Sequence, residues 1–338
     1  MLIKNKPIFY WLLSVIFFVV LMIIVGGLTR LFDAGLSMVN WHLFLDTIPP
    51  LTQQAWLNKF EVYKNFPEYN QYNKGMTLAE FKWIYFWEFI HRFIARILGL
   101  VFVLPFIYFL IKRKLSKSLL LTLCFALFLG TLQAFLGWYM VKSGLIDQPD
   151  VSHFRLAFHL ITAFLIFVTL LRAIFLSINL KKTKKSFSNY YKISMFLLTL
   201  FIFIQIIYGA FMAGLKAGYA FNTWPKMGDY WIVPGALPVS LDNYLNNIFV
   251  INWFHRSLGI LILVISIPLL LLLYQKFKSF TLSTFFIKGL AVSMFLQVFI
   301  GILTIIYIVP LPLASLHQIN TLFILFFLTT CLYQMKLF

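Results

Sequence analysis

The sequence predicts an all-α integral membrane protein, with eight transmembrane helices arranged as two tandem four-helix bundles. Composition and an internal repeat carry this prediction. Of the 338 residues, 62% are apolar and only 11% are charged, which is too little charge for an ordinary solvated surface. Motifs of the first half return in the second half in the same order. Because the repeat contains four spans, the bundles are expected to be related by a pseudo-twofold axis along the membrane normal.

Eight segments are long and apolar enough to cross a bilayer, which takes about 20 residues whose backbone groups bond within one helix. They cover residues 8–28, 83–111, 118–140, 154–179, 191–213, 250–274, 283–309 and 312–335. In the first long loop, Trp56, Phe60 and Tyr63 recur at helical spacing and predict a short helix on the membrane surface. Thr77 and Glu80 have capping-box spacing, so the second spanning helix is expected to begin outside the membrane.

Basic residues gather in alternate connections, and this placement predicts the orientation of the chain. They are Lys4, Lys6, Lys112, Arg113, Lys114, Lys117, Lys181, Lys182, Lys184, Lys185, Lys276, Lys278 and Lys336. The positive-inside rule puts these connections and both termini on the cytoplasmic side of the cell (inner) membrane, with the loops 29–80 and 214–249 outside. Membrane topology and lipid contact thus explain the net charge of +18, and no nucleic-acid partner is expected. The first span lacks a small-residue cleavage pattern, so we expect it to be retained.

The repeat divides the chain into an N-terminal half, residues 1–180, a cytoplasmic linker, 181–190, and a C-terminal half, 191–338. Gly26 matches Gly209 at an offset of 183 residues, and the Gln-x-x-x-Gly segments 133–137 and 297–301 match at an offset of 164. A glutamine inside a span must bond to a neighbour, and a nearby glycine permits close helix approach, so both segments are interpreted as packing features. Cys124 and Cys331 lie inside spans and are interpreted as small buried residues rather than as a disulfide.

Four histidines form two matched pairs. His91 and His255 lie in the repeated segments 88–92 and 252–256, while His159 and His317 lie in the last span of each half. Each is 19–22 residues from a basic anchor. At about 1.5 Å per residue, all four therefore lie roughly 30 Å from the inner boundary, at the outer edge of the hydrocarbon. A single histidine in a span is often a helix-packing residue, but four at one depth favour metal ligation.

A pair of histidines on facing helices suits a heme, whose flat macrocycle takes one axial ligand on each side. A zinc site is less favoured, because neither cysteine lies near these histidines in the sequence. The sequence therefore predicts two hemes, one in each half. The iron ligands would be His91 and His159 in the first half, and His255 and His317 in the second.

Three arginines near the histidines, Arg92, Arg155 and Arg256, are predicted to pair with heme propionates. The alternative for each is snorkelling to headgroup phosphates, which is also the reading for Arg172, deeper in its span. His153 precedes His159 by six residues, about 240° around a helix, so it is interpreted as an interfacial residue and not as a ligand. His42, in an outer loop, is expected to be solvated.

The two halves differ at one chemically important position. Glu88 lies three residues before His91, on roughly the same helix face, whereas the matching residue before His255 is the neutral Asn252. A carboxylate near a heme edge can stabilise a developing positive charge or move a proton. The first half is therefore predicted to be the reactive site and the second half a fixed electron-transfer site.

These ordered motifs resemble the heme A synthase family, whose members convert the C8 methyl group of heme O to the formyl group of heme A. They are Gly-Gly-x-Thr-Arg, Glu-Phe-x-His-Arg, Arg-x-x-x-His, Asn-x-x-His-Arg and a final His-Gln, and together they cover nearly the whole chain. The resemblance implies that His91 and His159 face the substrate heme O and that Glu88 is the acidic residue needed for turnover. It also implies that His255 and His317 ligate a retained heme b. Some members carry a cysteine pair in the outer loops; this chain has none there, so redox control through such a pair is not expected.

The resemblance also implies two successive oxidations of the methyl group, to an alcohol and then, with loss of water, to an aldehyde. Heme O and heme A would be substrate and product, and a heme O synthase and the assembling cytochrome c oxidase would be partners; an oligomer is compatible with the sequence. Two rival readings stay open. A diheme b-type cytochrome that passes electrons, for example from quinol, predicts the same histidines without Glu88. A parallel-repeat transporter is less favoured, because little charge lies near mid-membrane and no helix pair is clearly interrupted.

Overall fold

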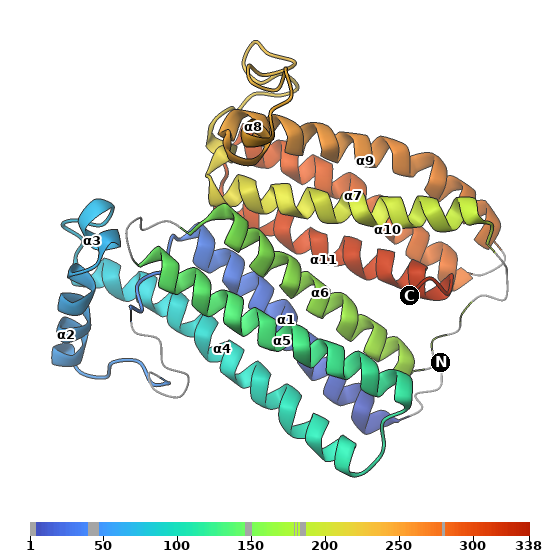
Figure 1. Cartoon of the computed structure of the whole chain (residues 1–338), viewed down its shortest axis with the longest axis horizontal. Coiled ribbons are helices and arrows are strands. Elements are labelled where there is room, and N and C mark those ends of the chain that lie inside the picture. Colours follow the sequence, from blue (N-terminus) through green and yellow to red (C-terminus); the bar gives the residue numbers. More distant parts are fainter. Residues whose placement is uncertain are drawn as a thin grey trace.

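The protein is a bundle of long helices. The computed structural model describes residues 5–39, 47–145, 151–178, 180, 182, 187–278 and 281–338, and within these ranges it contains helices and no strand. In the same ranges, eight helices are long and apolar enough to span a membrane. They are α1 (Lys6–Leu31), α4 (Leu78–Ile111), α5 (Lys117–Gly144), α6 (His153–Ser177), α7 (Asn189–Gly214), α9 (Ile248–Phe277), α10 (Thr281–Ile306) and α11 (Leu311–Gln334) (Figure 1). Each corresponds to one predicted span, so the prediction of an all-α membrane protein with eight spanning helices is confirmed.

The helix boundaries follow local capping signals. Thr77 and Glu80 form the predicted capping box, so α4 begins well before its apolar part. Helix α10 ends at Ile306, three residues before the predicted end of its span at residue 309. There Ile308 and Val309 take positive φ angles, which turn the chain toward α11.

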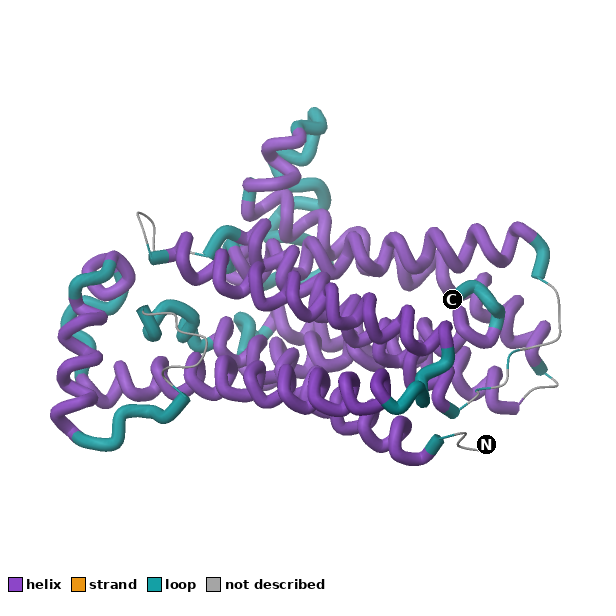
Figure 2. Tube along the Cα trace, turned by 60° about the horizontal axis from the view of Figure 1, so that its bottom comes forward, coloured by secondary structure: helices purple, strands orange, loops and turns teal. Residues whose placement is uncertain are grey.

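All eight helices run between the same two ends of the bundle (Figures 1 and 2). We call one the basic end: α1 begins there, α4, α6, α9 and α11 finish there, and the basic connections lie there. At the opposite end, the acidic end, lie the short helices α2 (Gln53–Lys64), α3 (Pro67–Gln71) and α8 (Leu241–Asn246) and the 3-10 turn η1 (Ala217–Tyr219). Which end faces the cytoplasm is taken up under the proposed function.

Helix α6 is the most buried of the eight long helices and contacts helices of both halves. More than half of its most apolar stretch, 56%, is buried, the largest share among the eight long helices of the described chain. It packs against α5 and α1, which precede it, and against α7 and α11 from the C-terminal half. The division into two bundles and their pseudo-twofold axis stay predictions. Residues 181 and 183–186 of the predicted linker lie outside the described ranges.

The long connection between α1 and α4 contains the predicted short helix. Trp56 and Phe60 of α2 pack on the first turns of α4, where Phe60 stacks on Phe81 with ring centroids 5.0 Å apart. Tyr63 is fully buried and donates a 2.8 Å hydrogen bond from its hydroxyl to the Glu68 carboxylate of α3. The helix is confirmed and its apolar face covers α4; its position on the membrane surface stays a prediction.

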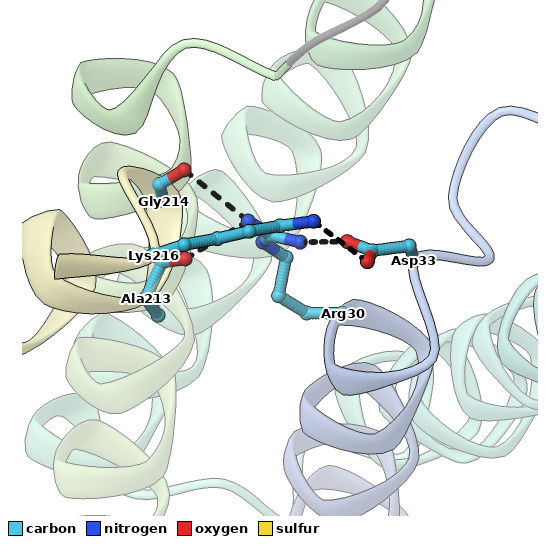
Figure 3. A network of polar contacts seen from close by, with 5 residues as sticks. All are labelled: Arg30, Asp33, Ala213, Gly214 and Lys216. Carbon is cyan, nitrogen blue, oxygen red and sulfur yellow. Dashed lines mark hydrogen bonds and ion pairs between the residues drawn. The ribbon is translucent and has the colours of Figure 1, made fainter. Parts of the chain in front are cut away.

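A polar clamp joins the two halves at the acidic end (Figure 3). Arg30, in the last turn of α1, donates from Nη2 to the carbonyl oxygens of Ala213 and Gly214, at 2.8 and 3.2 Å. These are carbonyls at the end of α7, where helical carbonyls lack partners within the helix. Asp33 completes the clamp by pairing with both Arg30 and Lys216.

The cysteines are both free, as predicted, but only one is buried. Cys331 lies in the core of α11, whereas Cys124 is exposed on the surface of α5. The prediction of burial was wrong for Cys124 because hydropathy gives the depth of a residue in a span and not the face of the helix on which it lies.

Candidate functional site

Each of the four histidine rings lies against a glycine of a neighbouring helix. His91 of α4 meets Gly26 of α1, and His159 of α6 meets Gly137 of α5. In the second half, His255 of α9 meets Gly209 of α7, and His317 of α11 meets Gly301 of α10. A Cβ at these glycines would lie only 2.9–3.4 Å from the imidazole Cε1. The absence of a side chain therefore makes room for each ring.

The same contact, a histidine ring against a glycine of a neighbouring helix, therefore occurs four times. In each half, a glycine of the first spanning helix supports the histidine of the second, and a glycine of the third supports that of the fourth. Gly137 and Gly301 were predicted to be packing features and Gly26 and Gly209 only to mark the repeat, and the structure shows that all four pack against the histidines. The sequence offered this signal, since the glycines and the histidines both recur, but nothing in it paired them.

Glutamine side chains of the glycine-bearing helices bond to three of the histidines, through the ring or through the backbone carbonyl. Gln133, four residues before Gly137, brings its Nε2 to 3.1 Å from Nε2 of His159. Gln205, four residues before Gly209, donates to the His255 carbonyl oxygen at 2.9 Å. Gln297, four residues before Gly301, donates to the His317 carbonyl oxygen at 3.0 Å. The prediction that Gln133 and Gln297 bond to a neighbouring helix is confirmed, and in both cases the neighbour is a site histidine.

The second histidine pair has the spacing of two ligands of one metal ion. The ring centroids of His255 and His317 are 6.4 Å apart, with an angle of 70° between the ring planes. Two imidazoles that bind one ion from opposite sides through bonds of about 2.0–2.1 Å have centroids roughly 6 Å apart. The structure thus brings together two histidines that are 62 residues apart in the sequence.

The histidines fit axial ligation of a heme better than a compact metal cluster. All four have a buried Nδ1 atom without a hydrogen-bond partner in the described structure, so each ring keeps a nitrogen uncommitted. No group of three or more histidine, cysteine or acidic residues gathers anywhere in the described ranges, as a zinc site would require. Paired imidazoles with no third protein ligand match the donor set of a bis-histidine heme.

Glu88 lies next to the first histidine and is buried, at 2% exposure. Its Oε2 accepts hydrogen bonds from the Ser37 hydroxyl at 2.7 Å and from the Met38 backbone N–H at 2.8 Å. Its Oε1 pairs with Arg92 one turn along α4. Three donors therefore stabilise the carboxylate, and they tie the segment after α1 to the site helix.

Asn252 and Arg256 occupy the matching positions in the second half and make neutral contacts. Asn252, fully buried, donates from Nδ2 to the Ala217 carbonyl oxygen at 2.7 Å. Arg256 donates to the carbonyl oxygens of Thr223 and Pro225, at 2.8 and 3.1 Å, and lies over the Trp224 ring. Both halves thus fasten the loop after their first helix to the histidine-bearing helix, but only the first half does so with a buried carboxylate.

The amino-acid sequence matches a family of known proteins over nearly its whole length. The profile of the COX15-CtaA family, described as cytochrome oxidase assembly protein, matches residues 9–329. The chain belongs to this family. It is 40% identical to the Heme A synthase of Flavobacterium johnsoniae, over 98% of this chain and 99% of that protein. It is 42% identical to the Heme A synthases of Flavobacterium psychrophilum and Wolbachia pipientis wMel, over 93% and 96% of this chain and 94% and 91% of those proteins.

The predicted propionate partners have different surroundings in this family member. Arg92 donates to Met38 O at 3.1 Å as well as pairing with Glu88, and Arg155 lies over the Tyr139 ring, 4.7 Å from its centroid. Arg256 keeps a buried Nη1 without a partner in the described structure. The assignment of these three arginines to propionates stays a prediction.

His153 has a role that sequence reasoning missed. It is buried where α6 meets α7. Its Nε2 lies 2.8 Å from the Leu245 carbonyl oxygen of α8. Its Cβ packs closely on Gly214 of α7, where an added Cβ would lie only 2.7 Å from it. It therefore joins the two halves, while its place at a membrane interface stays a prediction. His42, predicted to be solvated, falls outside the described residues.

Proposed function

We propose that this protein is an oxidoreductase that converts the C8 methyl group of heme O to the formyl group of heme A, for use in cytochrome c oxidase. The single observation that carries the proposal is the pair of matched histidine sites, of which only one has a buried carboxylate, Glu88. The resemblance to Heme A synthases along nearly the whole chain supports it.

In this proposal the two histidine sites have different roles, one in binding the substrate and one in binding a resident cofactor. His91 and His159 hold the substrate heme O in the first half, and His255 and His317 hold a resident heme b in the second. The bound hemes supply the iron redox chemistry. Conversion of a methyl to a formyl group takes two successive two-electron oxidations, each of which adds a hydroxyl group to the carbon. The first gives an alcohol, and the second gives a geminal diol that loses water to leave the aldehyde; an oxidant from outside the chain accepts the two electrons of each oxidation. The protein contributes ligation, position and charge.

Glu88 is the acidic residue that we assign to turnover. Its carboxylate is held in place by Ser37, Met38 and the Arg92 guanidinium, so it is an oriented group about one turn before His91. A fixed charge in a dry site stabilises positive charge that develops in the reaction without reorganisation. Asn252 cannot do this, which suits a second site that only transfers electrons.

The proposed orientation follows from the distribution of charge. We place the basic end in the cytoplasm and the acidic end, with α2, α3 and α8, outside the cell (inner) membrane. All four histidines then lie near the outer face. A heme O synthase and the assembling oxidase are the partners that this function implies.

The first experiment is extraction and chromatography of heme from cells that make heme O, with and without this chain. Expression should produce heme A. The Glu88→Gln variant should retain the heme b absorption spectrum but form no heme A, whereas Glu80→Gln, which removes an exposed carboxylate from the same helix, should form it normally. Heme A formation by Glu88→Gln would remove this carboxylate from the mechanism.

The rival diheme cytochrome is supported by one observation, the spacing of His255 and His317, which needs no carboxylate. His255→Ala should remove the bound heme b under either function, and an unchanged heme spectrum would contradict that ligand assignment. Heme b in the purified protein with no heme A formed, despite heme O and reductant, would favour the cytochrome. Purified protein without any heme would favour a transporter.

A further inference from the structure

Arg172 is a cation that the heme sites do not use. It follows His159 by 13 residues on α6, which places it roughly 20 Å nearer the basic end. Its Nη1 donates to the Thr122 hydroxyl of α5, and its guanidinium lies 5.9 Å from the centroid of the Phe338 ring. Within the described chain, no carboxylate forms an ion pair with it.

A cavity of about 290 Å³ opens beside this guanidinium. It is lined by Leu121, Thr122, Phe125, Thr169, Arg172 and Phe338. Leu121 and Phe125 are 61% and 51% exposed, so the cavity opens on the outer surface of α5. On a membrane-spanning helix this surface faces lipid. The cavity thus combines a cation and two hydroxyl groups with an apolar mouth.

Two further cations lie near Arg172. Lys182 packs over the Tyr333 ring, and its pKa is lowered by partial burial and by the positive charges of Arg172 and Lys336. These three groups repel one another, and the described structure gives none of them an acidic partner. An excess of positive charge in poorly solvated surroundings favours the binding of an anion.

The chain itself has no acidic residue at this end to act as a counter-ion. It contains ten acidic residues. Seven are described and lie at the acidic end or in the part of α4 nearest to it: Asp33, Glu61, Glu68, Glu80, Glu88, Asp229 and Asp242. Asp46, Asp147 and Asp150 fall, by sequence, in the connections after α1 and α5, which join helices at that same end. No acidic side chain therefore neutralises these three cations, and the α-carboxylate of Phe338, which also lies at this end, forms no ion pair with Arg172 in the described structure.

We propose that this cavity binds an anionic membrane phospholipid, with its phosphate on Arg172 and an acyl chain along Leu121 and Phe125. A guanidinium pairs with phosphate through two parallel hydrogen bonds. The Thr122 hydroxyl, which donates to the Ser118 carbonyl oxygen, accepts from Nη1 of Arg172 and so orients the guanidinium. Basic pockets between spanning helices on the cytoplasmic side are suited to such headgroups. The apolar mouth distinguishes a lipid from free phosphate, which gains nothing from Leu121 or Phe125.

The test is native mass spectrometry of the full chain in mild detergent, titrated with phosphatidylglycerol and with phosphatidylcholine of the same acyl chains. The wild type should retain one phosphatidylglycerol at least about fivefold more tightly than phosphatidylcholine, the preference expected from one basic residue at a membrane surface. Arg172→Gln should lose this preference. Lys112→Gln, which removes an exposed positive charge at the same end, should keep it.

Three results would overturn the proposal: an unchanged preference in Arg172→Gln, equal retention of both lipids by the wild type, or full displacement of phosphatidylglycerol by inorganic phosphate. If Arg172→Gln does not fold, Leu121→Trp decides, because this exposed position tolerates an indole that fills the cavity mouth. Retention of phosphatidylglycerol by Leu121→Trp as in the wild type would then contradict the site.

Discussion

At the scale of single residues, the histidine sites depend on glycines as much as on histidines. The room above each glycine differs among the four sites. A Cβ at Gly301 would lie 2.9 Å from Cε1 of His317, closer than real Cβ contacts, whereas a Cβ at Gly209 would lie 3.4 Å from Cε1 of His255, an ordinary contact distance. The two ligands of the proposed heme b should therefore respond differently to one added methyl group.

We predict that Gly301→Ala weakens heme b binding by about 1–3 kcal/mol, because the His317 ring must shift to avoid overpacking. Gly209→Ala should have a much smaller effect. Gly130→Ala, in α5 where a Cβ meets nothing within 4 Å, should stabilise the helix slightly and leave heme b unchanged. Absorption titration of heme b into each purified variant measures this, and equal losses in the Gly301 and Gly209 variants would contradict the steric argument.

At the scale of elements, the α2–α3 unit combines an aromatic face that packs on α4 with a buried hydrogen bond. Glu68 is buried at 7% exposure, and its carboxylate accepts from Tyr63, whose hydroxyl in turn accepts from Asn73 at 2.7 Å. Burial raises the pKa of the Glu68 carboxyl to about 8, against the opposing effect of the Tyr63 hydrogen bond and with smaller contributions from Glu88 and Asp33. Burial likewise raises the pKa of the Tyr63 hydroxyl.

This gives the unit a pH-dependent stability. The folded unit keeps the Glu68 proton up to about pH 8, while the unfolded segment loses it near the ordinary value of 4.5. Stability is therefore greatest below the ordinary pKa and falls as the pH rises toward 8, by up to about 1.4 kcal/mol per pH unit. Hydrogen exchange of α2 amides, corrected for the intrinsic pH dependence, should show this loss. Glu68→Gln should abolish the pH dependence, and a slope that persists in this variant would assign it to another group.

At the scale of the whole molecule, the clamp around Arg30 forms a polar contact between the two halves (Figure 3). Its partners are also repeat mates. Arg30 contacts Ala213, and Lys216 contacts Asp33, each across 183 residues, the same offset that relates Gly26 to Gly209. Contacts between equivalent residues are expected where a twofold axis passes, so they support the predicted pseudo-twofold relation.

The clamp contains one strong and one weak interaction. Arg30→Met should lower the free energy of unfolding by about 1.5–3 kcal/mol, because a largely buried guanidinium satisfies carbonyls at the end of α7. Lys216→Met should cost less than about 1 kcal/mol, since its side chain and that of Asp33 are more than half exposed. Thermal unfolding in detergent compares the two variants, and an equal or larger loss for Lys216→Met would contradict this ranking.

The sequence by itself determined the eight spans and the recurrence of the histidine motifs. A bilayer constrains the length and the hydropathy of each helix separately, so these features can be predicted from the residues of each segment alone. The capping box of α4 and the helix at Trp56 were predicted for the same reason, because their signals lie within a few residues.

Only the tertiary structure decided which side chains meet. The rotation of each helix about its axis selects the face that touches a neighbour, and this selection depends on the packing of all the helices together. The pairing of His317 with Gly301, the binding of the Met38 segment by Glu88, and the place of His153 between the halves all arise in this way. The exposure of Cys124 has the same cause.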